Sequence, residues 1–269
     1  MKRVAISLRG KCYDNKTNDC NNKIEFIDYQ KSLNSLFSNL IDLNKEYDFD
    51  FYLHGWVSDE NIIEKIIKDY KPKNKILEKQ INFYPKFSKI ENHQDILKER
   101  YKHLHKNKNR SHYDDINFQS YFQNIFSATY SISKSVEIIP KEINYDFIIN
   151  LRYDSLILDK IKLSTLDRNL FYTDFTNEHS HLFYGDFFYL SSDSNMRRFS
   201  KIHYFLQNKI YNNEDYTDWV SNILKNSKRT KGRYEHGIYS PQMIYSYFIN
   251  EFVIFEKIIP RFNIKLIKI

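Results

Sequence analysis

An arginine and an aspartate that directly follow an apolar segment are the first candidates for chemistry in this sequence. The segment runs over residues 145–151, and Arg152 and Asp154 follow it with one residue between them. Such a run is typical of a strand buried on both faces of a helix-covered sheet. Ligands of open α/β sheets bind outside the carboxyl ends of the strands, where a guanidinium can pair with phosphate and a carboxylate can hold a metal or a hydroxyl. A structural ion pair explains the two residues equally well.

Polar or aromatic residues also close other apolar segments of the chain. They are Arg9, Gly10, His54, Trp56, Asp174 and Asp186. Side chains from the ends of several strands can together line one pocket in such a sheet. We interpret Trp56 as a core residue rather than a stacking platform, whereas His54 fits either a structural histidine or a donor to phosphate.

Hydrophobic periodicity predicts the elements that position these residues. Strands over residues 3–8, 48–56 and 75–83 are expected to alternate with helices over 24–43 and from a cap at 58 or 59 to 70. This β-α-β-α-β order is the pattern of a parallel sheet with crossover helices. Beyond it we expect a helix over 117–136, the strand that ends at Arg152, strands over 169–175 and 181–190, a helix capped at 192–194, helices over 215–224 and 241–249, and strands over 252–255 and 264–267.

Length and composition are typical of a folded α/β protein. The chain has 269 residues, 17% of them aromatic, and no linker or repeat divides it, so residues 1–269 are expected to form one domain. A net charge of +7 favours anionic ligands or a negatively charged surface. The chain lacks G-x-x-x-x-G-K-S/T, G-x-G-x-x-G, G-x-S-x-G and H-E-x-x-H, which argues against common NTPases, dehydrogenases, α/β-hydrolases and zinc proteases.

Five short motifs occur in order along the chain. They are A-I-S-L-R-G at 5–10, F-x-L-H-x-W at 51–56, Y-x-P-x4-L-E-K-Q at 70–80, Q-x3-S-x2-Y-S-I-x-K-S at 123–135 with Y-D-F-I-I-x-L-R-x-D at 145–154, and G-D-F-F at 185–188. Together they resemble glycosyltransferases of bacterial capsule and lipopolysaccharide loci, including WavE-type proteins, and of large DNA viruses. The resemblance implies a single GT-A-like (Rossmann-like) α/β domain, with a mostly parallel central sheet, flanking helices and a small antiparallel extension. Residues 1–155 would bind the nucleotide-sugar and residues 156–269 the acceptor.

In this family a short acidic motif after a central strand holds a divalent metal on the donor diphosphate. Arg152-Tyr153-Asp154 occupies its place, with arginine at the position of the first carboxylate. In one alternative, Asp154 binds Mn²⁺ or Mg²⁺ together with His236 or waters. In the other, Arg152 and the basic residues 228–233 neutralise the diphosphate without a metal. Of the two, we favour the metal.

The implied reaction is displacement of a nucleoside diphosphate from a sugar by a hydroxyl of a glycan or polysaccharide acceptor. An inverting enzyme needs a carboxylate that takes the hydroxyl proton; Asp186 is the first candidate, followed by Asp174 and Glu235. The residues assigned to the donor are Arg9, Gly10, His54, Arg152, Asp154 and Arg233.

Cysteine usage and hydropathy bear on the compartment. Cys12 and Cys20 lie in one polar stretch without a disulfide or metal-ligand pattern, so a reducing compartment is expected. No run reaches the ~18 consecutive apolar residues of a membrane span. We therefore expect a cytoplasmic protein, of a bacterial cell or a virus-infected host, with at most peripheral membrane contact.

Two other functions are weighed against this one. Another transferase on a similar sheet, such as a nucleotidyl- or sulfotransferase, would differ in its donor. A noncatalytic nucleic-acid-binding protein is suggested by basic segments interleaved with Tyr and Phe. However, the two main basic stretches, residues 98–112 and 225–233, lie far apart and match no recognisable binding motif. No nucleic-acid partner is therefore expected.

Overall fold

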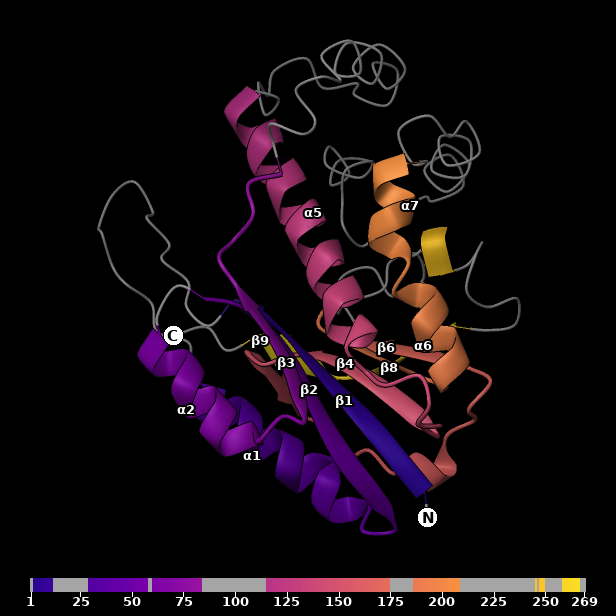
Figure 1. Cartoon of the computed structure of the whole chain (residues 1–269). Coiled ribbons are helices and arrows are strands. Elements are labelled where there is room, and N and C mark those ends of the chain that lie inside the picture. Colours follow the sequence, from indigo (N-terminus) through magenta and orange to yellow (C-terminus); the bar gives the residue numbers. More distant parts are fainter. Residues whose placement is uncertain are drawn as a thin grey trace.

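The protein has a mixed α/β fold whose centre is a mostly parallel sheet. The computed structural model describes residues 2–11, 29–57, 60–83, 115–174, 186–208, 245, 247–249 and 258–266. Within these residues, seven strands form one sheet in the order β3-β2-β1-β4-β7-β6-β8, and β5 and β9 form a two-stranded antiparallel sheet (Figure 1). The predicted class, a helix-flanked and mostly parallel sheet with a small antiparallel extension, is confirmed.

One strand of the large sheet runs against the others. The strands are β1 (Lys2–Lys11), β2 (Tyr47–Trp56), β3 (Asn74–Glu78), β4 (Phe147–Arg152), β6 (Phe171–Asp174), β7 (Phe188–Ser191) and β8 (Ile258–Phe262). The pairs β1–β2, β1–β4, β2–β3 and β6–β8 are parallel, whereas β7 is antiparallel to both of its neighbours. The carboxyl ends of β1, β2, β3 and β4 therefore lie at the same edge. The small sheet contains β5 (Ser155–Ile157) and β9 (Ile264–Leu266).

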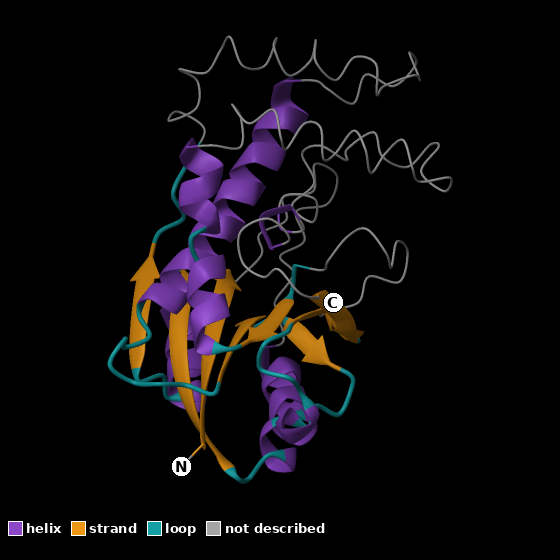
Figure 2. Ribbon diagram, turned by 90° about the vertical axis from the view of Figure 1, so that its right-hand side faces the viewer, coloured by secondary structure: helices purple, strands orange, loops and turns teal. Residues whose placement is uncertain are grey.

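Helices cover both faces of the sheet. On one face lie α1 (Tyr29–Asn39) and α2 (Glu60–Tyr70), and on the other lie α5 (Asp115–Glu137), α6 (Asp193–Phe199) and α7 (Ile202–Asn208) (Figure 1). Figure 2 shows the same arrangement from the side, with α5 extending beyond the sheet. Two short 3-10 helices, η1 (Ile41–Leu43) and η4 (Leu163–Thr165), lie in the connections that follow α1 and β5.

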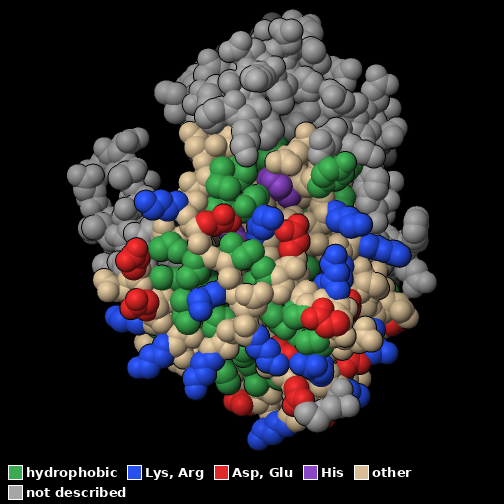
Figure 3. Space-filling model, in the orientation of Figure 1, with side chains coloured by type: hydrophobic (Ala, Val, Ile, Leu, Met, Phe, Trp, Pro, Cys, Tyr) green, Lys and Arg blue, Asp and Glu red, His purple; other side chains and the backbone are tan. Residues whose placement is uncertain are grey.

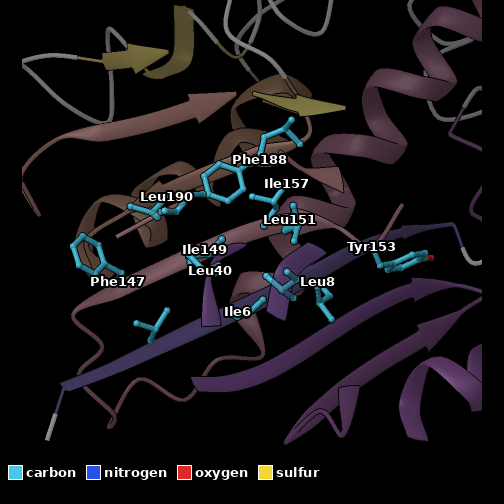
Figure 4. Close-up of a cluster of buried hydrophobic side chains, with 14 of the residues drawn as sticks. Ile6, Leu8, Leu40, Phe147, Ile149, Leu151, Tyr153, Ile157, Phe188 and Leu190 are labelled. Carbon is cyan, nitrogen blue, oxygen red and sulfur yellow. The ribbon is translucent and has the colours of Figure 1, made fainter. Parts of the chain in front are cut away.

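Alternation along the central strands separates two hydrophobic cores. Ile6 and Leu8 of β1 and Ile149 and Leu151 of β4 pack on the α1/α2 face (Figure 4). Successive strand residues point to opposite faces, so the residues between them face α5. There the apolar Ala5 and Ile148 give way to polar side chains as the strands approach their carboxyl ends. The polar groups of the strand ends are thus gathered under α5.

Most predicted elements are confirmed, and the differences have local causes. The helix predicted over residues 24–43 is described as α1 followed by η1, and residues 24–28 lie outside the described part. Just after η1, the Asn44 Nδ2 donates to the carbonyl oxygens of Leu40 and Ile161, at 2.6 and 2.7 Å. Asn44 thereby ties the end of this helical segment to the chain near η4.

The third strand is shorter than predicted, because its partner β2 ends at Trp56, which pairs with Glu78. The prediction extended it to Phe83, but β3 ends at Glu78. Beyond it, Gln123 of α5 accepts a hydrogen bond from Phe83 N at 2.7 Å and donates to Ile81 O at 2.6 Å. Phe83 remains buried in the core without being in a strand.

The carboxyl-terminal predictions were less accurate. Ser192 is the N-cap of α6, as one of the three predicted caps, but the single helix expected there is two helices, α6 and α7. The predicted strand over 264–267 corresponds to β9, whereas β5 and β8 were not predicted. The segments predicted over 215–224 and 252–255, and the basic stretch 98–112, lie outside the described residues.

Candidate functional site

Arg9 and Arg152 are neighbours at the carboxyl ends of β1 and β4. The parallel register pairs Arg9 with Arg152 and, two residues earlier, Ser7 with Asn150. Paired residues on adjacent strands point to the same face, so these four polar residues lie on the α5 face. The expectation that strand-end residues meet at one edge is confirmed for Arg9 and Arg152.

Arg9 is buried and already has partners within the protein. It is 2% exposed; its Nε donates to Asn150 Oδ1 at 2.5 Å and its Nη2 donates to the Asp186 backbone oxygen at 2.6 Å. Its guanidinium also lies over the Tyr189 ring, 5.8 Å from the centroid. Burial lowers the pKa of Arg9 below its ordinary value, although an arginine in a protein keeps its charge. Arg9 therefore joins β1 to the segment that carries Asp186.

Asn150 is a site residue that the sequence reasoning missed. It lies within the apolar run of β4 and is fully buried. Its Nδ2 donates to Ser7 Oγ at 3.0 Å and to Ser135 Oγ at 2.9 Å, while its Oδ1 accepts from Arg9. A buried polar side chain needs hydrogen-bond partners. An asparagine within an apolar strand run therefore indicates a buried polar contact, and this pattern could have identified Asn150 from the sequence.

Arg152 and Asp154 form a bidentate ion pair. Arg152 Nε donates to Asp154 Oδ1 at 2.8 Å, and Arg152 Nη2 donates to Asp154 Oδ2 at 2.6 Å. Burial acts to lower the pKa of Arg152, but the charge and hydrogen bonds of Asp154 outweigh it and the pKa is raised. Arg152 also lies over the Phe187 ring at 5.7 Å. The ion pair considered from the sequence is thus present, at the strand end where a ligand was also expected.

Two further predicted carboxylates, Asp174 and Asp186, lie near this pair. Asp186 is half-buried; burial raises its pKa, while the charges of Arg152 and Arg9 act to lower it. Asp174, at the end of β6, is 1% exposed, and burial together with the charge of Asp186 raises its pKa to about 7. Of the two, Asp186 is the one with exposed surface.

Gly10 has a backbone conformation that side chains rarely adopt. Its φ is +134°, in the region that favours glycine. The Tyr153 ring lies 3.6 Å from the position that a Cβ at residue 10 would occupy, and Tyr153 N donates to Arg9 O at 3.3 Å. The group that approaches this glycine within the protein is therefore the Tyr153 ring. Donor binding by Gly10 stays a prediction.

His54 has a protein partner on each ring nitrogen. It is fully buried; Nδ1 lies 2.8 Å from Ser131 Oγ and Nε2 lies 2.9 Å from Glu78 Oε1. Burial lowers its pKa, although Glu78 acts to raise it. Its ring packs edge-on against Trp56, which is 3% exposed and belongs to the hydrophobic core. These contacts suit a structural histidine, and the assignment of His54 to the donor stays a prediction.

The described residues do not by themselves assemble a metal centre. Both oxygens of Asp154 accept hydrogen bonds from Arg152. In the described ranges, no group of three or more His, Cys, Asp and Glu side chains is arranged to hold a metal ion. The other predicted ligand, His236, lies outside those ranges, as do Arg233 and Glu235.

Charge is mixed on the surface in view. On the face shown in Figure 3, Lys and Arg side chains are interspersed with Asp and Glu among the coloured residues. This differs from the clustered basic stripe that is typical of nucleic-acid-binding surfaces.

No helix within the described part of the chain is long and apolar enough to cross a bilayer.

Comparison with known proteins gives only distant structural similarity. No family model matches the sequence, and no curated protein matches it. Among solved structures, mouse xyloside xylosyltransferase 1 in its apo form is similar over 93% of this chain and 81% of its own, with 12% identity and a TM-score of 0.36.

Two further solved structures show similarity of the same degree. The apo glycosyltransferase GlyE of Streptococcus pneumoniae TIGR4 is similar over 94% of this chain, with 11% identity and a TM-score of 0.35; this chain spans 44% of its length. A structure described as that of a mutant transferase is similar over 98% of this chain and 93% of its own, with 14% identity and a TM-score of 0.35. Two of the three are named as glycosyltransferases, but TM-scores this low support no conclusion about this chain.

Proposed function

We propose that this chain is a glycosyltransferase that moves a sugar from a nucleoside-diphosphate donor to a hydroxyl of a glycan or polysaccharide. The proposal rests on the proximity of Arg152, Asp154 and the half-buried Asp186 at one edge of the sheet. Arg152 and Asp154 lie at the carboxyl end of the parallel strand β4, and Asp186 lies two residues before the reversed strand β7, where the charge of Arg152 acts on it. Ligands of open α/β sheets bind at this edge. A guanidinium is suited to a diphosphate, because its planar fork can donate two hydrogen bonds to phosphate oxygens.

In the proposed reaction, Asp186 takes the proton of the acceptor hydroxyl. The hydroxyl oxygen forms a bond to the anomeric carbon of the donor while the bond from that carbon to the diphosphate breaks. The electron pair of the broken bond leaves with the diphosphate, whose negative charge Arg152 stabilises. A carboxylate base works best when its pKa is near the working pH, and burial moves the pKa of Asp186 upward.

The Arg152–Asp154 pair bears on the role of the metal. The Nε and Nη2 contacts to Asp154 use two of the five N–H groups of the Arg152 guanidinium, so the others can donate to the diphosphate. Each Asp154 oxygen keeps a further lone pair for a cation or for a donor hydroxyl. The metal-free alternative needs only Arg152 and the basic residues 228–233. The metal-dependent alternative adds Asp154 and His236 as ligands of Mn²⁺ or Mg²⁺, and the two alternatives differ in whether added metal strengthens nucleotide binding.

The proposal is tested by thermal unfolding in the presence of UDP, GDP, CDP and their sugars, with Mn²⁺ or with a chelator. One nucleotide should stabilise the protein selectively, by roughly 2.7 kcal/mol at about 100 times its Kd. Asp154→Asn should abolish any Mn²⁺-dependent part of the shift. Asp159→Asn is the matched control, since this half-buried aspartate lies outside the site and accepts a hydrogen bond from Asn263 N.

The rival functions predict other outcomes of the same measurements. Stabilisation by a nucleoside triphosphate or a sulfated nucleotide, but by no nucleoside diphosphate, would indicate another class of transferase. Binding of nucleic acid that weakens steeply with salt, without selective nucleotide binding, would indicate the noncatalytic alternative. Absence of a shift with every nucleotide-sugar would remove the basis for the glycosyltransferase.

A further inference from the structure

Asp174 holds the backbone of the segment that carries Asp186. The Asp174 Oδ1, at the end of β6, accepts hydrogen bonds from Phe187 N at 3.2 Å and from Phe188 N at 3.1 Å. Phe188 is the first residue of β7, and Asp186 precedes it by two. A single carboxylate oxygen therefore binds the two N–H groups that immediately follow Asp186.

Two other strands hold the same segment through its carbonyl groups. Arg152 N in β4 donates to Phe187 O at 3.1 Å, and Arg9 of β1 donates to Asp186 O at 2.6 Å. The N–H groups of the segment are thus held by β6, and its carbonyl groups by β4 and β1. Loss of the β6 contacts would leave two N–H groups without acceptors and release one side of the segment.

Asp174 itself is poorly placed to react with a substrate. It is 1% exposed, and its second oxygen, Oδ2, is buried with no hydrogen-bond partner among the described residues. Accepting the two N–H groups requires one oxygen and no negative charge. A neutral acid, or an amide of the same shape, can therefore make the same contacts.

We propose that Asp174 is a positioning residue, which sets the place of Asp186 by accepting the N–H groups of Phe187 and Phe188. The inference rests on the proposed glycosyltransferase function, in which Asp186 is the base. It reassigns Asp174 from the second candidate for the base to the residue that orients the first. A misplacement of a reacting group by about 1 Å can reduce a rate on the order of 100-fold.

The test compares Asp174→Ala with the isosteric Asp174→Asn. In the ligand-free protein, amide hydrogen exchange at Phe187 and Phe188 should accelerate about tenfold or more in Asp174→Ala and stay near the wild-type rate in Asp174→Asn. In transfer assays, Asp174→Ala should lose on the order of 100-fold in kcat, with the Kd of the selected nucleoside diphosphate little changed. Asp174→Asn should recover most of the kcat that alanine loses.

Asp159→Ala is the matched control, because it removes a carboxylate that accepts one backbone N–H, from Asn263, away from this segment. It should change neither the exchange at Phe187 and Phe188 nor kcat. The positioning role is overturned if Asp174→Asn is as inactive as Asp174→Ala. It is also overturned if Asp174→Ala keeps its activity. A wild type that binds none of the nucleoside diphosphates overturns the proposed function instead, while the exchange rates still report whether Asp174 holds the segment.

Discussion

Replacing Asp174 by asparagine is expected to stabilise the protein at alkaline pH. The Asp174 carboxyl is 1% exposed, and burial, reinforced by the charge of Asp186, raises its pKa from 3.8 to about 7. The unfolded chain releases this proton near pH 3.8, whereas the native state keeps it until about pH 7. The difference, about 7 minus 3.8, is about 3 pKa units, and at about 1.4 kcal/mol per unit it amounts to on the order of 4 kcal/mol.

The sign of the effect follows from which state binds more protons. Between about pH 4 and pH 7 the native state binds more, so the stability of the wild type contributed by this group falls as the pH rises. Asparagine at this position does not titrate and resembles the neutral acid. The two proteins should therefore have similar free energies of unfolding near pH 4, and near pH 8 the variant should be more stable by up to on the order of 4 kcal/mol.

Urea unfolding of both proteins across this pH range, at constant ionic strength, measures the difference directly. Asp159→Asn is the control for removing a carboxylate elsewhere. The reasoning is refuted by a difference between wild type and Asp174→Asn that does not depend on pH. It is refuted equally by a wild type that becomes more stable relative to the variant as the pH rises.

Two further effects should be measurable by the same unfolding experiment. Burial lowers the pKa of His54, so the wild type should lose stability as the pH falls below the ordinary value of 6.5. The difference in free energy of unfolding between the wild type and His54→Gln should therefore become smaller at low pH. A difference that does not change with pH would contradict a buried neutral histidine. Gly10→Ala should reduce the free energy of unfolding by about 1–3 kcal/mol, because alanine is strained at positive φ. The Tyr153 ring, at 3.6 Å, leaves ordinary van der Waals room for the methyl group, so unchanged stability would mean that the backbone strain was misjudged.

The amino-terminal half of the fold was largely predictable, because its signals are local. Apolar runs and helical periodicity identified β1, β2, β4, α2 and α5 with small errors at their ends. The carboxyl-terminal strands were harder. β5 has only three residues, too few to carry a strong pattern of its own, and its partner β9 lies about 110 positions later in the chain.

From the sequence, Arg9 and Arg152 could be placed at one edge of the sheet, but the contacts of the candidate site residues could not be predicted. Arg9 and Arg152 were expected at one edge because parallel strands end together. Asn150 was missed, since its partners Ser7 and Ser135 come from a different strand and a helix. Asp174 and Asp186 each stand beside an apolar run, so the local sequence pattern did not distinguish one carboxylate from the other.

The sequence by itself determined the α/β class, the strand that ends at Arg152, and the presence of a guanidinium and a carboxylate at that end, because hydrophobic periodicity acts over a few residues. Only the tertiary structure decided how those groups are used. The bond from Arg9 to Asp186 O spans 177 positions, and Asp174 reaches the N–H groups of Phe187 and Phe188 because the reversed strand β7 pairs beside β6. Partners so distant along the chain, and the burial that shifts the pKa of Asp174, exist only once the strands have paired.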